Sequence, residues 1–336
     1  MRLLILGAGG FIGSNLVEYL LAHTDHEVVG IDRSAEKLEG VAGDAFRFIE
    51  ADVTDAAELL DREVAAADVV VDLVAYAHPS LYVEAPLDVI RLNFLVNLET
   101  VDRCVAHGTR LFQFSTSEVY GKPSGDRYVE DESDLVVGPV TRQRWVYSVS
   151  KQLLERVIHA HGLAGDLEYT IVRPFNFVGP RFDYLVPAGT KGGPRAFAHF
   201  MSALLTGGPI HLVDGGHQRR SFTHIDDASA AVALLLEHPG ARNEIFNIGN
   251  PANDASIREV VALMMELYEE LTGVRPRNEL VEISGEEFYG PGYEDTTRVL
   301  PDISKLRALG WEPRRDLRTT FRETMRSYLD TPEEDR

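Results

Sequence analysis

Cysteine is almost absent from this sequence of 336 residues, which contains only Cys104. A single cysteine cannot form an internal disulfide, so we expect a reducing compartment, the cytoplasm. Cys104 lies within an expected helix, where a small packed residue is a simpler interpretation than a nucleophile. The histidine, cysteine and carboxylate residues show no metal-ligand spacing, so we expect no metal site.

Long apolar runs are also missing, as is an excess of positive charge. No run approaches the ~20 residues that a membrane-spanning helix needs. Met1 leads directly into an expected strand, which leaves no room for a signal peptide. The 33 basic residues against 53 acidic ones give a formal net charge of −20, which argues against nucleic acid as a partner. We therefore expect neither a membrane nor a nucleic acid partner.

A glycine-rich turn stands between an expected buried strand (3–6) and a helical pattern (14–21). Gly7, Gly10 and Gly13 are spaced as G-x-x-G-x-x-G. Glycine is needed where the backbone turns tightly against a pyrophosphate, and the helix N-terminus then faces the negative charge. A turn without a ligand is the alternative, but the strand–turn–helix setting favours a dinucleotide site.

Acidic residues follow the next two expected strands. Asp32 stands nineteen residues after Gly13, where a carboxylate accepts hydrogen bonds from ribose hydroxyls and repels a 2′-phosphate, which favours NAD over NADP. Arg33 could soften that preference, and Asp52 is placed to suit the adenine amino group. The alternation of strands and helices predicts an α/β fold with a Rossmann-like, doubly wound parallel sheet. The expected strands after the first are 27–31, 46–49, 68–74 and 111–114.

Tyr147 and Lys151 lie one helical turn apart on one face of an expected helix. A free phenol titrates near ~10 and a lysine near ~10.4, so neither is a useful base at neutral pH. We expect a fixed ammonium beside the phenol to lower the pKa of Tyr147 and make it a general base. The alternative is an ordinary surface tyrosine and lysine. Thr116 and Glu118, just after strand 111–114, could order a reacting hydroxyl and transfer protons.

Together these residues resemble the extended short-chain dehydrogenase/reductase family, in its sugar-nucleotide branch. The resemblance runs from residue 1 to about 328 and includes three further stretches. These are 115–121 (STSEVYG), 144–153 (RWVYSVSKQL) and 173–176 (RPFN), which are similar to UDP-glucuronic acid decarboxylases and UDP-apiose/UDP-xylose synthases of this family. The stretches 213–216 (VDGG) and 290–293 (GPGY) are similar to the latter.

The resemblance implies a domain division and a set of contacts. It implies an NAD-binding Rossmann domain over 1–175, to which the chain returns around 222–250, and a smaller C-terminal substrate lobe, mainly 176–330. The implied NAD contacts are Gly7, Gly10, Phe11, Ile12, Asp32, Asp52, Val53, Leu73, Ala75, Tyr147 and Lys151. The implied contacts to a UDP-sugar substrate are Tyr82, Ser117, Asn176, Arg195, Arg220 and Tyr293.

The implied activity is NAD-dependent decarboxylation of UDP-glucuronic acid, with Thr116, Glu118, Tyr147, Lys151 and Arg298 as catalytic residues. In the relatives the carboxylate-binding arginine stands two residues before a proline. Here Val299 occupies that register, and Arg298 is expected to serve from one residue earlier. The expected products are a UDP-4-keto-pentose and UDP-xylose. The alternatives are a UDP-glucuronate 4-epimerase or another nucleotide-sugar epimerase or dehydratase, and a non-enzymatic nucleotide-sensing module.

The resemblance also implies a homodimer in which helices 92–107 and 148–161 of each subunit pair. The second helix carries more apolar residues than burial on one side requires. These residues are Leu153, Leu154, Val157 and Ile158.

Overall fold

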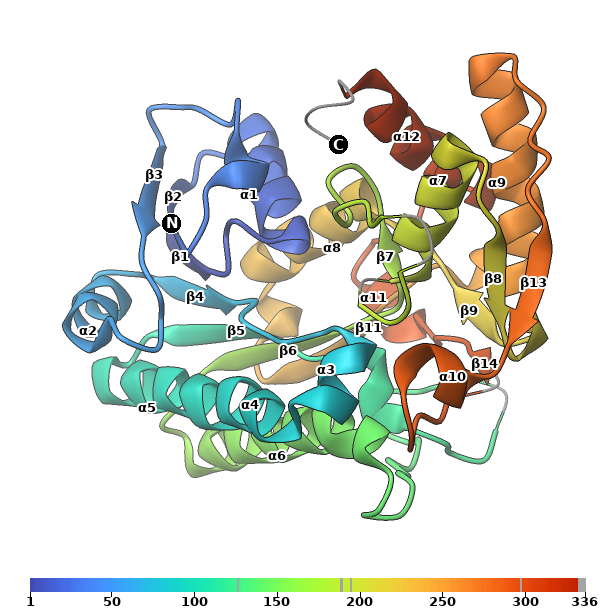
Figure 1. The fold of residues 1–336 in the computed structure, drawn as a ribbon. Helices are drawn as coiled ribbons and strands as arrows, with labels where there is room; N and C mark the ends of the chain where they lie inside the picture. Colours follow the sequence, from blue (N-terminus) through green and yellow to red (C-terminus); the bar gives the residue numbers. More distant parts are fainter. Residues whose placement is uncertain (126, 188–189, 194, 297, 332–336) are drawn as a thin grey trace.

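A seven-stranded sheet forms the centre of the protein (Figure 1). The computed structural model describes residues 1–331 apart from 126, 188–189, 194 and 297. The strand order is β11-β6-β5-β4-β1-β2-β3, and all neighbouring strands run parallel. The expected doubly wound parallel sheet is therefore confirmed. Its strands are β1 (Arg2–Leu6), β2 (Glu27–Asp32), β3 (Phe46–Glu50), β4 (Val69–Asp72), β5 (Arg110–Phe114), β6 (Tyr169–Pro174) and β11 (Glu244–Ile248).

Helices cover both faces of this sheet because its strands are apolar on both sides. Side chains alternate along a strand, so β4 sends Val71 to one core and Val70 to the other. The first core lies under α1 (Phe11–His23) and α8 (Ile225–Glu237). The second core also contains Cys104, and burial raises the pKa of its thiol to about 12. This second core lies under α2 (Ala57–Ala65), α5 (Asn97–His107) and α6 (Val146–Ala164).

The helix expected over 92–107 starts earlier and is not uniformly α-helical. The chain is helical from α4 (Pro86–Ile90), and the segment Arg91–Val96 is a π-helix that leads into α5. Asn93 in this segment and Asn97 at the start of α5 bind main-chain atoms of the loop that leaves β4 through their side chains. The sequence pattern missed this because π turns have no sequence signature in a single chain.

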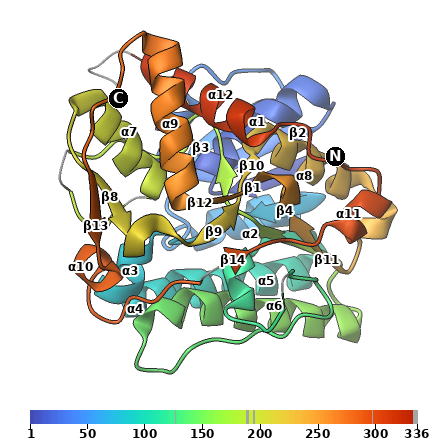
Figure 2. The ribbon, with the colours of Figure 1, turned by 90° about the vertical axis from the view of Figure 1, so that its right-hand side faces the viewer.

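The remaining elements form the second lobe beside the carboxyl edge of the sheet (Figure 2). Between these elements the chain returns to the main sheet through α8 and β11. The lobe's larger helices are α7 (Ala196–Thr206), α9 (Ile257–Thr272) and α12 (Leu317–Asp330), and its strands are β8 (Ile210–Val213), β9 (Arg219–Ser221), β12 (Asp254–Ser256), β13 (Leu280–Ile283) and β14 (Arg298–Val299). Apart from α3 (Pro79–Glu84), which follows β4 and packs against α4, the short elements are β7 (Phe177–Val178), β10 (Thr223–His224), α10 (Gly285–Tyr289) and α11 (Ser304–Ala308).

Within this lobe, Ser256 and Glu259 form a capping box at the start of α9, as the S-x-x-E pattern predicts. The segment 184–195 is rich in Gly, Pro and Thr, which predicts a loop, and it includes 188–189 and 194, which lie outside the described residues. Among the helices that the structure describes, none combines the length and apolarity needed to cross a membrane.

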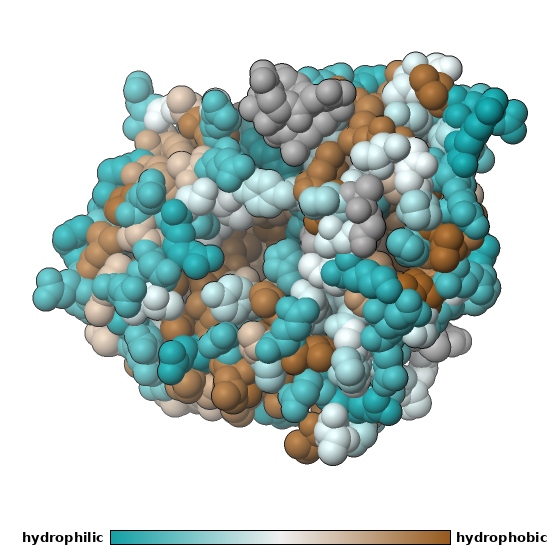
Figure 3. Space-filling model, viewed as in Figure 1, coloured by the Kyte–Doolittle hydropathy of each residue, from teal (hydrophilic) through white to brown (hydrophobic). Residues whose placement is uncertain are grey.

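An apolar surface lies along α4, the π-helical segment and α6, which pack side by side. Leu95 is 50% exposed and Leu153 is 45% exposed, and Leu87, Ile90 and Val149 are exposed beside them. Figure 3 shows apolar residues along the lower edge of the molecule, where Figure 1 places these helices. Leu154 and Ile158 face inward instead and are fully buried. The helix α6 thus has a second apolar face that the monomer leaves uncovered.

We predict that this surface forms a homodimer interface and that Leu153→Asp weakens it. A buried aspartate in an apolar interface has no partner, so its desolvation opposes association. Light scattering at micromolar concentration should show a dimer for the parent chain and a monomer for the variant. Val274→Asp, an equally drastic change at an exposed residue after α9, should remain dimeric. A monomeric parent chain would refute the prediction.

Candidate active site

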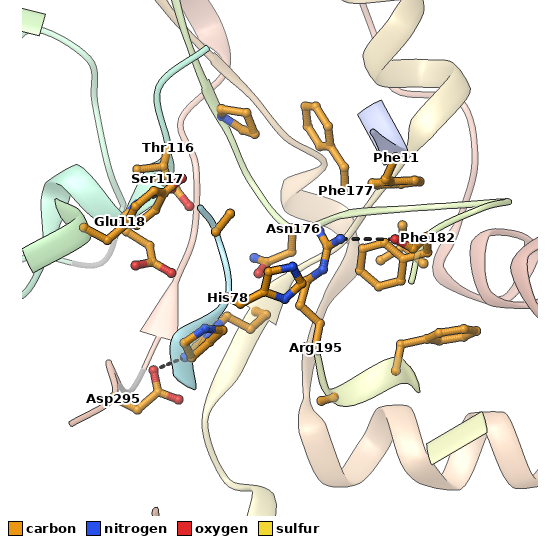
Figure 4. A pocket seen from close by; sticks show the side chains of 18 of the residues that line it. Phe11, His78, Thr116, Ser117, Glu118, Asn176, Phe177, Phe182, Arg195 and Asp295 are labelled. Atoms are coloured by element: carbon orange, nitrogen blue, oxygen red, sulfur yellow. Dashed lines mark hydrogen bonds and ion pairs between the residues drawn. The ribbon is translucent and has the colours of Figure 1, made fainter. Parts of the chain in front are cut away.

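A cavity of about 500 Å³ lies where the carboxyl edge of the sheet meets the second lobe. Figure 4 shows Thr116, Ser117 and Glu118 on one side of it and Phe11, Phe182 and Arg195 on the other. Most of the site residues expected from the sequence line this cavity. They are Gly7, Gly10, Phe11, Ile12, Leu73, Ala75, Tyr82, Thr116, Ser117, Glu118, Tyr147, Lys151, Asn176, Arg195, Arg220 and Tyr293.

The turn between β1 and α1 fits a dinucleotide pyrophosphate. Gly7 has a φ of +84°, which disfavours any residue with a side chain, and a Cβ on Gly13 would lie 2.2 Å from the Gly7 oxygen. Gly10 is the N-cap of α1 and has no side chain to cap the helix. The first N–H groups of α1 are therefore directed at the cavity, where they can bind phosphate oxygens.

The acidic residues expected at the adenosine end lie outside the lining of the cavity. The Asp32 carboxylate accepts from the main-chain N of Gly9 at 3.0 Å, so it is fixed beside the glycine turn. Asp52 accepts from the N and Oγ1 of Thr54, and these hydrogen bonds lower the pKa of Asp52. The Arg33 guanidinium lies 3.8 Å from Asp52 and is exposed. Arg33 is thus directed at the Asp52 carboxylate. Val53, another expected NAD contact, packs against the second core.

Tyr147 lies deep in the cavity with its ring 4.9 Å from the ring of Tyr82, nearly parallel to it. Burial, and secondarily the Glu118 charge, raise the pKa of Tyr147, while a hydrogen bond with Thr116 acts in the opposite direction. The expectation that Lys151 lowers this pKa is therefore wrong for the ligand-free chain. The physical reason is that removal of the phenol from water outweighs the nearby positive charges.

Lys151 is 2% exposed, and its ammonium donates to the main-chain oxygen of Phe114 at 3.1 Å. Burial lowers the pKa of Lys151, and the charges of Asp72 and Glu155 act in the opposite direction. The lysine is therefore anchored at the end of β5, one helical turn from Tyr147.

Arg144 is a cavity residue to which the sequence analysis assigned no role. It is 5% exposed, and its Nη1 donates to Glu118 Oε2 at 2.6 Å. Its guanidinium also lies 5.5 Å from the ring centre of Tyr82, and its Nε has no hydrogen-bond partner among the described residues. Its position three residues before Tyr147, at the start of the stretch 144–153, is the sequence feature that could have indicated a role in the site.

Two further arginines face the cavity from the second lobe, and both are held by carboxylates. Arg220 donates to Asp295 Oδ1 at 2.5 Å and to the Thr296 main-chain oxygen at 3.0 Å. The Arg195 guanidinium forms two hydrogen bonds with Asp183, of 3.1 and 2.9 Å, and lies 4.1 Å from the ring centre of Phe182. Two other expected substrate contacts stand nearby, Asn176, which donates to the Ser221 oxygen, and Tyr293, which stacks on Tyr289.

Arg298 does not line the cavity, so the structure does not support the role expected of it. Its main chain pairs with β9, and its side chain is 43% exposed and donates to Asp254 Oδ2 at 2.8 Å. Asp254 also binds Arg219. The short parallel pairing of β14 with β9 fixes the direction of Arg298, so the side chain cannot make up for the shift of one residue.

His224, Asp226 and Glu323 come close enough to suggest a cation site. The Arg315 guanidinium, however, pairs with both carboxylates at 2.6 and 3.2 Å. His224 Nδ1 accepts from the main-chain N of Asp226, which leaves Nε2 to carry the proton toward Glu323. This cluster is therefore interpreted as an ion-pair network that joins α8 to α12.

Comparisons with known proteins agree with this geometry. Residues 3–249 match the NAD dependent epimerase/dehydratase family. A UDP-D-apiose/UDP-D-xylose synthase of Oryza sativa subsp. japonica is 38% identical, over 97% of this chain and 88% of the relative. The PbgP3 protein of Burkholderia pseudomallei has a similar structure, with a TM-score of 0.86 and 37% identity over 97% of this chain and 96% of that one. A dTDP-glucose 4,6-dehydratase of Streptomyces venezuelae, solved with NAD, has a TM-score of 0.83 and 26% identity over the whole of both chains.

The fixed position of Asp32 predicts that the chain binds NAD at least about tenfold more tightly than NADP. A 2′-phosphate would meet the carboxylate, and one charge-assisted hydrogen bond to the ribose would be lost. Calorimetric titration with both dinucleotides measures the ratio. Asp32→Asn should reduce it, whereas Asp44→Asn, which removes an exposed charge between β2 and β3, should not. Equal affinities in the parent chain would contradict the prediction and give Arg33 the leading role.

Proposed function

This chain belongs to the NAD-dependent epimerase/dehydratase family, and from that premise we propose that it decarboxylates UDP-glucuronic acid after oxidation at C4. The proposed products are a UDP-4-keto-pentose and UDP-xylose. The observation that carries the proposal is the buried Arg144 guanidinium, which shares the cavity with Thr116 and Tyr147. A cation there suits a sugar that carries a carboxylate. The similarity to a UDP-D-apiose/UDP-D-xylose synthase supports the same class of substrate.

The first step is oxidation of the sugar at C4. NAD, when bound, supplies the hydride acceptor, and the β1–α1 turn, Leu73, Ala75 and Lys151 would hold it. The Tyr147 oxygen accepts the proton of the C4 hydroxyl while Thr116 keeps that hydroxyl oriented. Because burial holds the phenol in its protonated form in the ligand-free chain, the base form must arise in the complex. The Lys151 ammonium on the same helical face favours it there.

The second step is loss of carbon dioxide. A ketone at C4 is β to the C6 carboxylate, so the C5–C6 bond breaks and its electron pair enters an enolate over C5, C4 and the C4 oxygen. Arg144 orients the carboxylate with its planar pair of donors. Glu118, which is hydrogen-bonded to the same guanidinium, then lies beside the substrate carboxylate. Glu118 is placed to deliver a proton to C5, which gives the UDP-4-keto-pentose. Return of the hydride to C4, with a proton from Tyr147 to the C4 oxygen, would give UDP-xylose.

Epimerisation at C4 would use the same oxidation without loss of carbon dioxide. Incubation with UDP-glucuronic acid and NAD, followed by product masses and released carbon dioxide, separates the two reactions. A product lighter by carbon dioxide, or by carbon dioxide and two hydrogens, supports the proposal. A product of unchanged mass that differs only in configuration would refute it.

Tyr147→Phe should lower the rate of C4 oxidation by ~10²–10⁴-fold, the usual contribution of a positioned acid–base group. The aromatic ring that stacks on Tyr82 stays in place, so the fold and NAD affinity should not change. The absorbance of NADH formed with UDP-glucuronic acid measures the step. Tyr268→Phe, on α9 outside the cavity, is the matched control. A near-normal rate in Tyr147→Phe would exclude this role for the phenol.

Arg144 and Arg298 give opposite expectations. Arg144→Ala should raise the Kd for UDP-glucuronic acid by ~10–100-fold, the contribution of a lost charge-assisted hydrogen bond. The same variant should bind UDP-xylose, which has no carboxylate, much as the parent does. Arg298→Ala should leave carbon dioxide release unchanged because its side chain is bound to Asp254. If Arg298→Ala instead abolished carbon dioxide release while Arg144→Ala did not, the assignment would be reversed.

A further inference from the structure

Asp72 is a fully buried carboxylate to which the proposed mechanism assigns no role. It ends β4 and is 0% exposed. One carboxylate oxygen accepts from the main-chain N of Val74 at 3.0 Å. The other, Oδ2, makes no direct hydrogen bond in the part of the chain that the structure describes, and the nearby Gln113 side chain only partly offsets the burial of this carboxylate. A carboxylate oxygen this deep without a donor is costly unless a positive charge lies near it.

The nearest candidate for that charge is Lys151. Asp72 lies on the same side of the sheet as Val70, the side that α5 and α6 cover. It is paired in register with Gln113 on β5, next to Phe114, whose main-chain oxygen accepts from the Lys151 ammonium. Two fully buried ionisable groups of opposite sign therefore lie in the same region under α6, without a direct ion pair between them.

Electrostatic effects agree with this placement. Burial raises the pKa of Asp72, and Lys151 is the largest opposing charge. Burial likewise lowers the pKa of Lys151, and Asp72 is its largest opposing charge. The other titratable groups that act here are Glu155 on α6, which acts on Lys151, and the Cys104 thiol on α5, whose pKa is raised by burial and then by Asp72.

We propose that Asp72 is a positioning residue that serves as the buried counter-charge of Lys151 and keeps its ammonium protonated beside Tyr147. The part of this inference that concerns catalysis rests on the proposed function, whereas the charge pairing does not. Lys151 needs such help because its direct partner, the Phe114 carbonyl, is a dipole without a full charge. A buried ammonium with only dipolar partners readily loses its proton.

The sign of the effect follows from the pairing. A negative Asp72 favours the charged form of Lys151, so its removal must lower the pH at which Lys151 loses its proton. In Asp72→Asn the amide oxygen can still accept from the Val74 N–H, and the side chain keeps its shape without the charge. We expect the titration midpoint of Lys151 to fall by about one pH unit or more. We therefore expect the decrease in rate at alkaline pH to begin at a correspondingly lower pH.

The charge pairing can be tested without substrate or cofactor, because the chain has only five lysines. They are Lys37, Lys122, Lys151, Lys191 and Lys305. Protein labelled with carbon-13 at the lysine Cε gives one NMR titration curve for each, and Lys151→Arg identifies the Lys151 signal. Asp72→Asn should shift that curve to lower pH. Asp61→Asn, the same chemical change at an exposed residue on α2, should not shift it.

An unchanged Lys151 curve in Asp72→Asn would overturn the proposal, because Asp72 would then be a neutral, protonated group. If this variant does not fold, the carbon-13 NMR signal of the Asp72 carboxyl carbon in the parent chain shows whether the group is ionised. An ionised carboxylate at neutral pH supports the pairing, and a protonated one refutes it. The second readout is the pH profile of kcat/KM with UDP-glucuronic acid. In Asp72→Asn, a uniform loss of rate at all pH values would show a purely structural role and refute the proposal. If the parent chain itself is inactive with UDP-glucuronic acid, only the proposed substrate is disproved.

Discussion

The helix that carries the tyrosine–lysine pair is held on the sheet by one buried ion pair, between Glu155 of α6 and Arg173 of β6. Two hydrogen bonds, of 3.0 and 2.7 Å, join the guanidinium to the carboxylate, and the two residues are 5% and 3% exposed. Arg173 also donates to the Tyr120 hydroxyl and to the Glu130 main-chain oxygen. Because one unpaired member would cost ~3–5 kcal/mol, this pair strongly disfavours any other register of α6, and the active site depends on that register.

Three arginines of the cavity are paired with carboxylates before any ligand arrives, in a protein whose formal net charge is −20. An anionic ligand must therefore replace an internal carboxylate as the partner of an arginine. Its binding free energy is then the difference between the energies of the new and the old ion pair. Neutral ligands cannot make that exchange, which gives the site selectivity for charged groups. The pairs are Arg144 with Glu118, Arg220 with Asp295, and Arg195 with Asp183.

The sequence alone predicted the parallel sheet, with five of its strands, and most of the predicted site residues line the cavity. Buried parallel strands are short apolar runs, and the glycine turn at Gly7 follows the first of them, so both are visible in local patterns. Residues at strand ends, such as Thr116, could be assigned to one edge because parallel strands end on the same side. The tyrosine–lysine pair follows from helical periodicity in the same way.

The tertiary structure alone decided the electrostatics and the fate of single long side chains. The direction of Arg298 depends on the pairing of β14 with β9, which two residues of sequence do not encode. The pKa of Tyr147 depends on how deeply packing buries the phenol, and the sequence analysis had considered only the neighbouring charge. The role of Arg144 depends on its contact with Glu118, 26 residues away. Local sequence specifies backbone conformation through short-range sterics, whereas burial and charge pairing arise only when distant segments meet.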